Sequence, residues 1–343
     1  MNILRNISLA DYSTMKLGGV ANYLTIVEDQ RTLIEVIDAA KKHNIKIIMI
    51  GNGSNIIWRD EGFPGLVIVN KILGFELSRE DEIGSFITVG SGENWDSVVK
   101  RSVAMGLSGI ECLSLIPGTA GATPIQNVGA YGQDISQTLA TLYAYDSLAN
   151  KMVTLSASDC ELGYRKSRFN TNDIGRFFIT SITLCLRKLN PLPPFYPSLA
   201  SYLEEHQIKE YTPENIRNAV IKIRQQKLPD PLVIPNCGSF FANPIVDKSV
   251  LENLQENFPM VPSWSIEGSS SVKLSAAWLL EQVGLNDYFD QETGIATYEF
   301  QPLVFINRSA KTTNDLIKFA DLVKNKVKQH FNIELIQEPL LLP

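Results

Sequence analysis

The feature that most constrains this chain is residues 116–132, a glycine-rich run that reads IPGTAGATPIQNVGAYG. The run carries no charged residue, and its small side chains follow neither the period of a helix nor the alternation of a strand. An irregular segment of this length inside a compact domain is usually functional. Its backbone amides could line a large, flat cofactor, and a long structural loop is the alternative.

A second glycine-rich loop, GNGSN at residues 51–55, follows the strand-like stretch IKIIMIG. Glycine admits unusual backbone angles and close approach, so the amides of this loop could cradle a diphosphate. No Gly-Lys-Ser/Thr follows, which excludes a Walker loop, and the third glycine of the dinucleotide-binding fingerprint is missing. A plain turn is the alternative.

The remaining pattern predicts an α+β fold rather than a strict doubly wound sheet. Helical spacing is found at residues 29–43, 93–106, 212–229, 275–284 and 312–330, and strand-like stretches at 45–51, 65–70, 86–92, 141–147, 151–157, 176–189 and 303–307. A chain of 343 residues suggests two or three domains. The proline-rich segment 190–197 should be extended, and we predict a domain boundary beside it, between regions 1–200 and 201–343.

Composition and charge narrow the possible partners. The formal net charge of −6 argues against binding to nucleic acid. The first residues, MNILRNISLADYS, lack the layout of a secretory signal. The apolar stretches are shorter than the ~20 residues that span a membrane. We therefore expect a cytoplasmic protein without a nucleic-acid or membrane partner.

Cysteine and histidine spacing predicts neither a metal site nor acyl-transfer chemistry. The cysteines form no C-x-x-C pair and are expected to be reduced thiols: Cys112, Cys160, Cys185 and Cys237. The histidines stand in charged contexts near predicted helix ends, where a positive side chain complements the helix dipole: His43, His206 and His330. None is placed as a general base, so a Ser-His-Asp or Cys-His mechanism is not expected.

Five motifs stand in one order across most of the chain: GNGSN, IPGTAGATPIQNVGAYG, GYRKSRF (163–169), KLPDP (227–231) and NCGSFFANP (236–244). Together they closely resemble the UDP-N-acetylenolpyruvoylglucosamine reductase (MurB) family, and the segment around Tyr196 resembles the substrate-covering loop of its longer type. The resemblance implies an FAD-binding region at 1–200, with two α+β subdomains of the PCMH type shared with vanillyl-alcohol oxidase. It also implies a substrate-binding α+β domain at 201–343, whose last strand packs back on the FAD region.

The same resemblance implies the reaction. With noncovalent FAD and NADPH as the hydride donor, an enzyme of this family reduces UDP-N-acetyl-3-O-(1-carboxyvinyl)-glucosamine to UDP-N-acetylmuramate for peptidoglycan synthesis. Hydride reaches the vinyl carbon, and negative charge is then delocalised into the substrate carboxylate. We therefore expect a small-molecule UDP-sugar as the partner, a monomer, and no metal.

Three residues match the family's catalytic positions. Arg165 would stabilise the developing charge, because a guanidinium binds a carboxylate through two hydrogen bonds and stays charged. Ser239 would give a proton to carbon rather than act as a nucleophile. Glu338 would be the second charge-stabilising residue, although Pro339 replaces the family's valine and Glu334 is a nearby fallback. The alternatives are a surface arginine at 165 and a turn serine at 239.

Binding positions carry over from the same motifs. The residues expected to contact FAD are Gly51, Asn52, Gly53, Ser54, Asn55, Pro117, Gly118, Gly121, Ala122, Gln126, Asn127, Gly129, Ala130, Tyr131 and Gly132. Those expected to contact the substrate are Tyr164, Tyr196, Arg224, Lys227, Asn243, Lys273 and Gln301. Two departures from the family concern the substrate: Trp264 stands where a tyrosine is expected, and the neighbours of Gln301 differ.

The residues leave two other functions open. The first is a flavoenzyme of the same fold that oxidises an alcohol, often with its flavin tethered to a His or Cys. Neither glycine-rich loop contains a histidine, although Cys112 precedes the second loop. The other is a nucleotide-sugar binder without catalytic activity, which would not carry a flavin that NADPH bleaches.

Overall fold

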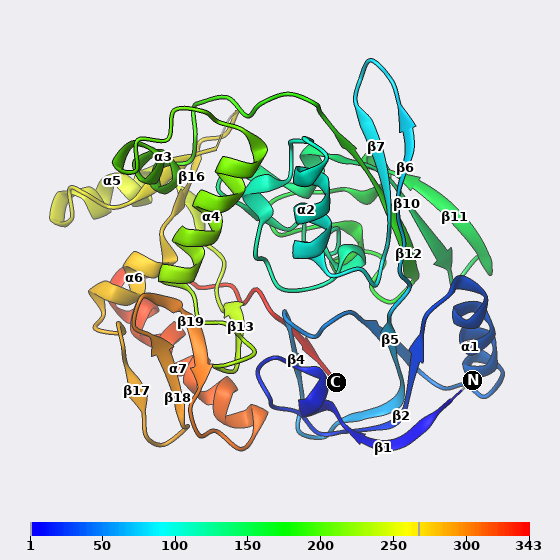
Figure 1. Ribbon diagram of the computed structural model, residues 1–343. Helices are drawn as coiled ribbons and strands as arrows, with labels where there is room; N and C mark the ends of the chain where they lie inside the picture. The colour runs from blue at the N-terminus through cyan, green and yellow to red at the C-terminus, as the bar shows by residue number, and fades with distance from the viewer. Residues whose placement is uncertain (1, 267) are drawn as a thin grey trace. The chain divides into compact units, whose positions relative to one another are not determined.

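The computed structural model describes residues 2–266 and 268–343. Contacts divide the chain into two compact units, and we describe each by itself. Unit 1 comprises Met1–Ile7, Ala21–Asn52 and Phe63–Gln226, and unit 2 comprises Ser8–Val20, Gly53–Gly62 and Lys227–Pro343. Each unit is therefore assembled from three separate stretches of sequence. Figure 1 colours the chain by residue number, from blue at the N-terminus to red at the C-terminus.

The first sheet of unit 1 has the strand order β1-β2-β5-β3. Its strands are β1 (Leu4–Ser8), β2 (Val20–Val27), β5 (Phe63–Asn70) and β3 (Ile47–Ile50), and β5 runs parallel to both β2 and β3. Helix α1 (Gln30–Lys42) begins after Asp29, whose carboxylate accepts a hydrogen bond from the Thr32 amide at 2.8 Å. It packs on this sheet (Figure 1) through a stripe with helical spacing: Leu33, Val36, Ile37 and Ala40.

The second sheet of unit 1 is antiparallel and has the order β11-β10-β12-β7-β6. Its strands are β11 (Lys151–Ser156), β10 (Leu139–Asp146), β12 (Phe177–Leu186), β7 (Ser85–Gly90) and β6 (Phe75–Glu80). Along most of β12 buried and half-buried residues alternate, which is the period that predicted this strand. Helix α2 (Trp95–Ala104) shares a core with this sheet, and the Trp95 indole donates a hydrogen bond to the Leu113 carbonyl at 3.1 Å.

Two further helices pack in unit 1, α3 (Pro197–Glu205) and α4 (Pro213–Lys227), the latter up to Gln226. Their apolar faces share one buried cluster with Cys112. Arg217 joins α4 to α2, because its guanidinium donates two hydrogen bonds to the Asp96 carboxylate, at 2.7 and 2.9 Å. Both helices therefore belong to unit 1, which includes residues up to Gln226.

Unit 2 contains one antiparallel sheet of order β13-β19-β18-β17 and a smaller one of order β14-β16-β15. The strands are β13 (Asn236–Ser239), β14 (Ile245–Asp247), β15 (Ser263–Ser265), β16 (Ser271–Leu274), β17 (Phe289–Asp290), β18 (Ile295–Tyr298) and β19 (Gln301–Asn307). The helices are α5 (Lys248–Asn257), α6 (Ala276–Gln282) and α7 (Thr313–Phe331). The core of this unit includes a cluster of stacked and edge-to-face rings: Phe240, Phe241, Phe305 and Phe319.

Another pairing in unit 2 joins stretches that are far apart in the sequence. Strand β20 (Leu340–Leu342) runs parallel to β4 (Ile56–Trp58). At the start of α7, the backbone amides of Thr313 and Asn314 donate hydrogen bonds to the Asp60 carboxylate at 2.7 and 2.9 Å. The last strand therefore pairs with a strand from region 1–200 of the sequence.

The predicted α+β class is confirmed, and the predicted helices correspond to α1, α2, α4, α6 and α7. The histidines lie at helix ends as expected: His43 and His206 follow α1 and α3, and His330 is in the last turn of α7. The cysteines are free thiols. Within residues 2–266 and 268–343, no helix combines the length and the apolar character that a membrane span needs.

Candidate functional site

The glycine-rich segment 116–132 lies in unit 1 and folds as a series of turns. A short 3-10 helix covers Ala120–Ala122, and β8 (Gly129–Ala130) pairs with β9 (Gln133–Asp134) in a small hairpin. Gly118 has φ +133°, a conformation that residues with side chains rarely adopt. The segment is irregular over most of its length, as its composition predicts.

The first two residues of the loop 51–55 meet the segment 116–132 within unit 1. The Asn52 side-chain amide donates a hydrogen bond to the Gly118 carbonyl at 3.4 Å, and a Cβ on Gly51 would lie 2.3 Å from Thr119 Oγ1. In the part of the chain that the structure describes, the backbone N–H groups of Gly118 and Thr119 donate to no backbone carbonyl. Buried amides rarely stay unpaired, so these two fit a role as donors to the oxygens of a cofactor diphosphate.

Gly121 shows that this segment needs glycine for packing as well. A Cβ at this position would lie 2.4 Å from Ser91 Cβ. We expect Gly121→Ala to lower the free energy of unfolding by about 1–3 kcal/mol, the usual cost of overpacking. Thermal unfolding with FAD in excess measures this. Gly163→Ala is the matched control, because its Cβ would meet only Lys166 Cβ at 3.9 Å. Equal melting temperatures for the two variants would contradict the close contact.

Asn127, a residue expected to contact FAD, uses its side chain inside the protein. The residue is 3% exposed, its side-chain nitrogen donates to the Gly163 carbonyl at 3.0 Å, and its oxygen accepts from the Ser136 amide at 2.9 Å. The side chain therefore links the glycine-rich segment to the turn that carries Arg165. Any contact of Asn127 with FAD would therefore have to come from its backbone.

Arg165 lies in a tight turn of unit 1 between Gly163 and Lys166. The backbone amide of each end residue donates to the carbonyl of the other, at 2.9 and 3.1 Å. Arg165 itself has φ 53°, in the left-handed region that residues other than glycine seldom occupy. Its guanidinium donates to the Gly129 carbonyl at 3.1 Å and lies 5.5 Å from the centre of the Tyr164 ring. The structure thus places two predicted site residues, Arg165 and Tyr164, beside the glycine-rich segment.

A second arginine of unit 1, Arg224 on α4, lies among aromatic residues. Its Nε atom is buried and has no hydrogen-bond partner within the described residues. Burial lowers the pKa of Arg224, and the neighbouring Tyr131 hydroxyl opposes that shift. The rings of Tyr131 and Tyr196 meet edge to face with their centres 5.9 Å apart. Two predicted binding residues, Tyr131 and Tyr196, therefore lie together beside a third, the Arg224 cation, which can bind an anion.

Ser239 ends strand β13 in unit 2, on a backbone that is fixed on both sides. The preceding Gly238 has φ +75°, and its amide donates to Asn236 Oδ1 at 2.9 Å. The amide of the following Phe240 donates to the Leu303 carbonyl at 2.7 Å. The glycine is required here because its φ is one that side chains disfavour.

Glu338 lies beside the same stretch of unit 2, since its amide donates to the Phe240 carbonyl at 2.9 Å. Cys237 is 2% exposed, and burial raises the pKa of its thiol to about 12, so it packs as a neutral group. The fallback residue Glu334 forms an ion pair with Lys328 at 2.6 Å, which lowers the pKa of Glu334. Glu338 therefore lies beside the strand that carries Ser239, whereas the Glu334 carboxylate is paired with a lysine.

The other predicted substrate residues of unit 2 come from several elements. Asn243 accepts a hydrogen bond from the Ala276 amide at 3.0 Å, at the start of α6, and Lys273 lies 5.7 Å from the centre of the Trp264 ring. Lys227 is the last residue of α4, and Gln301 is the first residue of β19.

The remaining residues expected to contact FAD are divided between the units. Unit 2 contains Gly53, Ser54 and Asn55, whereas unit 1 contains Pro117, Ala122, Gln126, Ala130 and Gly132. Among the residues described, no cluster of His, Cys, Asp and Glu could hold a metal ion.

Known proteins resemble the whole chain. Residues 21–147 match the FAD binding domain family, and residues 230–342 match the C-terminal domain of UDP-N-acetylenolpyruvoylglucosamine reductase. The chain is 36% identical to the UDP-N-acetylenolpyruvoylglucosamine reductase of Dechloromonas aromatica, with 100% of each chain covered. The corresponding protein of Ralstonia nicotianae is 35% identical, with 97% of each chain covered.

A solved structure shares the fold. The crystal structure of UDP-N-acetylenolpyruvylglucosamine reductase from Thermus caldophilus gives a TM-score of 0.67 at 21% identity, with 100% of both chains covered. Together, this fold, the match to the FAD binding domain family and the relatives named above define an FAD-binding oxidoreductase of the α+β class. The chain belongs to the UDP-N-acetylenolpyruvoylglucosamine reductase (MurB) family, as its five motifs predict.

Proposed function

We propose that the protein reduces UDP-N-acetyl-3-O-(1-carboxyvinyl)-glucosamine to UDP-N-acetylmuramate, as a monomer in the cytoplasm, for peptidoglycan precursor synthesis. The observation that carries this proposal is the likeness to relatives named for this reductase, which covers 97% of the chain in one case and 100% in another. When bound, FAD would supply the hydride, with NADPH as its source. The protein's own residues bind the substrate, stabilise charge and deliver one proton.

Arg165 is the residue proposed to stabilise the charge that develops on the substrate carboxylate. A guanidinium presents several N–H donors in one plane, and the hydrogen bond to the Gly129 carbonyl at 3.1 Å orients that plane. Stabilising such a charge is usually the largest single contribution to catalysis. Glu338 is the proposed second residue at the carboxylate, where it would have to carry or share a proton.

Arg224 is proposed to bind an anionic part of the substrate. The Tyr131 hydroxyl and the Asp96 carboxylate offset the burial of this cation only in part, since the pKa of Arg224 is still lowered, and its Nε atom lacks a partner within the described residues. The diphosphate or the carboxylate of the UDP-sugar has the required charge. Tyr131 and Tyr196, whose rings are in contact, would close the apolar side of this subsite.

Ser239 is proposed to give the proton to carbon. A serine hydroxyl is a weak acid, so it depends on the basicity of the enolate and on nearby cations that favour the alkoxide. Its fixed backbone supports this role, because Gly238 and Phe240 on either side are both hydrogen-bonded. Protonation at carbon needs a donor held in one direction, which such a strand end provides.

The visible spectrum of the purified protein tests the proposal. We expect stoichiometric flavin absorbance that NADPH bleaches and the enolpyruvyl substrate restores. Absence of flavin would favour the nucleotide-sugar binder. Flavin that an alcohol reduces, and that oxygen but not the enolpyruvyl substrate reoxidises, would favour the alcohol oxidase.

Acid precipitation of the same sample tests how the flavin is held. We expect all of it in the supernatant, because Cys112 is 4% exposed and burial strongly raises the pKa of its thiol. A buried neutral thiol is a poor nucleophile for a covalent tether. Flavin in the pellet would contradict noncovalent binding.

A further inference from the structure

The turn that carries Arg165 has a conformation that must be held from outside. The left-handed region is strained for a residue other than glycine, and Arg165 has φ 53°. The reciprocal hydrogen bonds between Gly163 and Lys166 close the turn, but they do not orient it within unit 1. Strained conformations persist where surrounding contacts over-determine them.

Asn170 makes one of these contacts. Its side-chain nitrogen donates a hydrogen bond to the Arg165 carbonyl at 3.2 Å, while its oxygen accepts one from the Ser167 amide at 2.8 Å. The second bond belongs to the capping box of the short 3-10 helix Arg168–Asn170. The cap does not require the first bond. The oxygen of the Asn170 side chain therefore caps the helix, while its nitrogen separately holds the turn.

Asn127, which precedes the turn in the sequence, makes a second contact. Its nitrogen donates to the Gly163 carbonyl at 3.0 Å, and its oxygen is held by the Ser136 amide. The hydroxyl of Ser167 adds a bond to the Ile125 carbonyl at 2.6 Å. The side-chain amides of Asn127 and Asn170 therefore hold two backbone carbonyls of the turn, those of Gly163 and Arg165.

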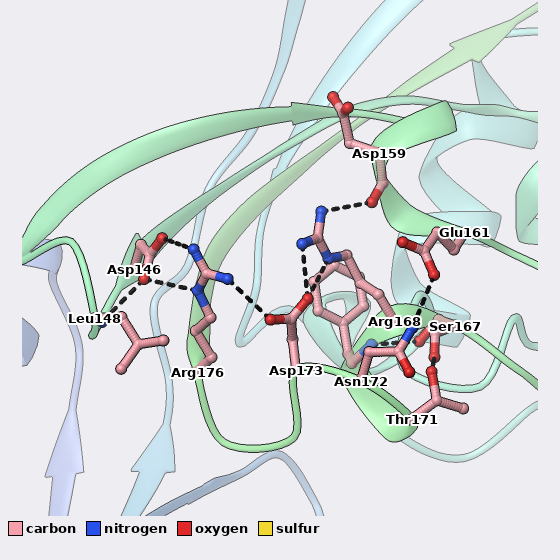
Figure 2. Close-up of polar contacts among 11 residues, drawn as sticks. Asp146, Leu148, Asp159, Glu161, Ser167, Arg168, Thr171, Asn172, Asp173 and Arg176 are labelled. Carbon is pink, nitrogen blue, oxygen red and sulfur yellow. Dashed lines mark hydrogen bonds and ion pairs between the residues drawn. The ribbon is translucent and has the colours of Figure 1, made fainter.

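The segment that carries Asn170 is anchored by the charged network drawn in Figure 2. Arg168 donates to the Asp173 carboxylate at 2.7 Å, and Arg176 joins Asp173 at 2.9 Å to Asp146 at 2.7 Å (Figure 2). The hydrogen bonds from Arg176 lower the pKa of Asp146 to about 2. Burial alone would raise the pKa of Asp173, but the two guanidinium groups outweigh it and lower that pKa. Both carboxylates therefore stay ionised at neutral pH, and Asp146 fixes the segment to β10.

We propose that Asn127 and Asn170 form an amide clamp that positions Arg165 for catalysis. The proposal rests on the role proposed above for Arg165. Both asparagines act through hydrogen bonds to backbone carbonyls of the turn, so they are positioning residues. Their loss should weaken transition-state stabilisation more than substrate binding, because a displaced guanidinium keeps its charge.

The variant Asn170→Asp separates the two tasks of the side chain. Aspartate keeps an oxygen for the Ser167 amide but has no N–H for the Arg165 carbonyl. We expect NADPH to reduce the bound flavin at the wild-type rate, and reoxidation of the pre-reduced enzyme by the enolpyruvyl substrate to slow by about 10–100-fold. The melting temperature should stay near that of wild type, because the cap is retained.

The matched control is Asn172→Asp, which adds the same charge two residues along the same segment. The side chain of Asn172 donates to the Glu161 carboxylate at 3.2 Å and not to the turn. We expect wild-type reoxidation in this control. An equal slowing in Asn170→Asp and Asn172→Asp would assign the effect to charge and overturn the clamp, as would a wild-type rate in Asn170→Asp.

A double-mutant cycle with Arg165→Lys distinguishes the clamp from the proposed function. If Asn170 acts through Arg165, Asn170→Asp should slow reoxidation far less in the Arg165→Lys background than in wild type. Additive effects would overturn the clamp and leave the role of Arg165 intact. A wild-type reoxidation rate in Arg165→Lys alone would instead overturn the role of Arg165 itself.

Discussion

Replacing Ser239 with alanine is expected to slow reoxidation of the reduced flavin by the enolpyruvyl substrate by about 10²–10⁴-fold, the usual loss when a positioned general acid is removed. Reduction of the flavin by NADPH should stay near the wild-type rate, because that step needs no proton from Ser239. Rapid mixing of the pre-reduced variant with substrate, followed at the flavin absorbance, separates the two steps. Ser239→Cys, a stronger acid of similar shape, should recover part of the rate.

Ser265→Ala is the matched control for this experiment, since Ser265 is an exposed residue of strand β15 in the same unit. It should leave both half-reactions unchanged. Wild-type reoxidation in Ser239→Ala would rule out the proton-donor role. Equal slowing of both half-reactions, with a lower melting temperature, would instead indicate a serine that stabilises a turn.

Arg165→Lys should lower kcat by about 10²–10³-fold while KM for the enolpyruvyl substrate changes much less. Lysine keeps the positive charge but cannot form two parallel hydrogen bonds to a carboxylate. The charge that Arg165 meets develops only as hydride reaches the substrate, so the loss should fall on turnover. Steady-state kinetics with NADPH in excess give both parameters.

The control for Arg165→Lys is Arg31→Lys, on the exposed face of α1, where Arg31 forms an ion pair with Glu35 at 2.9 Å. It should leave both kcat and KM at their wild-type values. A normal kcat in Arg165→Lys would exclude Arg165 as the charge stabiliser. A rise in KM alone would show that the arginine binds the substrate and its transition state equally.

Helices with strong local signals could be predicted from the sequence. In α1, the cap at Asp29 and the apolar stripe of Leu33, Val36, Ile37 and Ala40 are adjacent in the chain, so spacing alone identifies them. Helix α3 was not predicted, because it follows a proline-rich segment and is stabilised by tertiary packing of Leu199 and Leu203 against α4. The helix propensity of residues 197–205 does not show that α4 will pack against them.

The site was predictable as a set of motif residues but not as a set of contacts. The motifs name Arg165 and Ser239, yet they do not show the left-handed turn at 165 or the hydrogen bond that Asn170 gives it. They name Asn127 as a cofactor residue, whereas its side chain is buried and bonded within the protein. Such contacts depend on which segments meet in space, and hydrophobic periodicity does not determine that.

The hydrogen bonds between Asp60 and the start of α7 limit where the chain can be cut into independently folding pieces. A split between residues 226 and 227 would leave α7 without the acceptor for its first amides and β20 without its neighbouring strand β4. The piece 227–343 is therefore not a transferable module, even though most of unit 2 comes from it. Recombination between two members of the family would have to exchange residues 8–20 and 53–62 together with 227–343, so selection should act on these three separate stretches as a single inherited block.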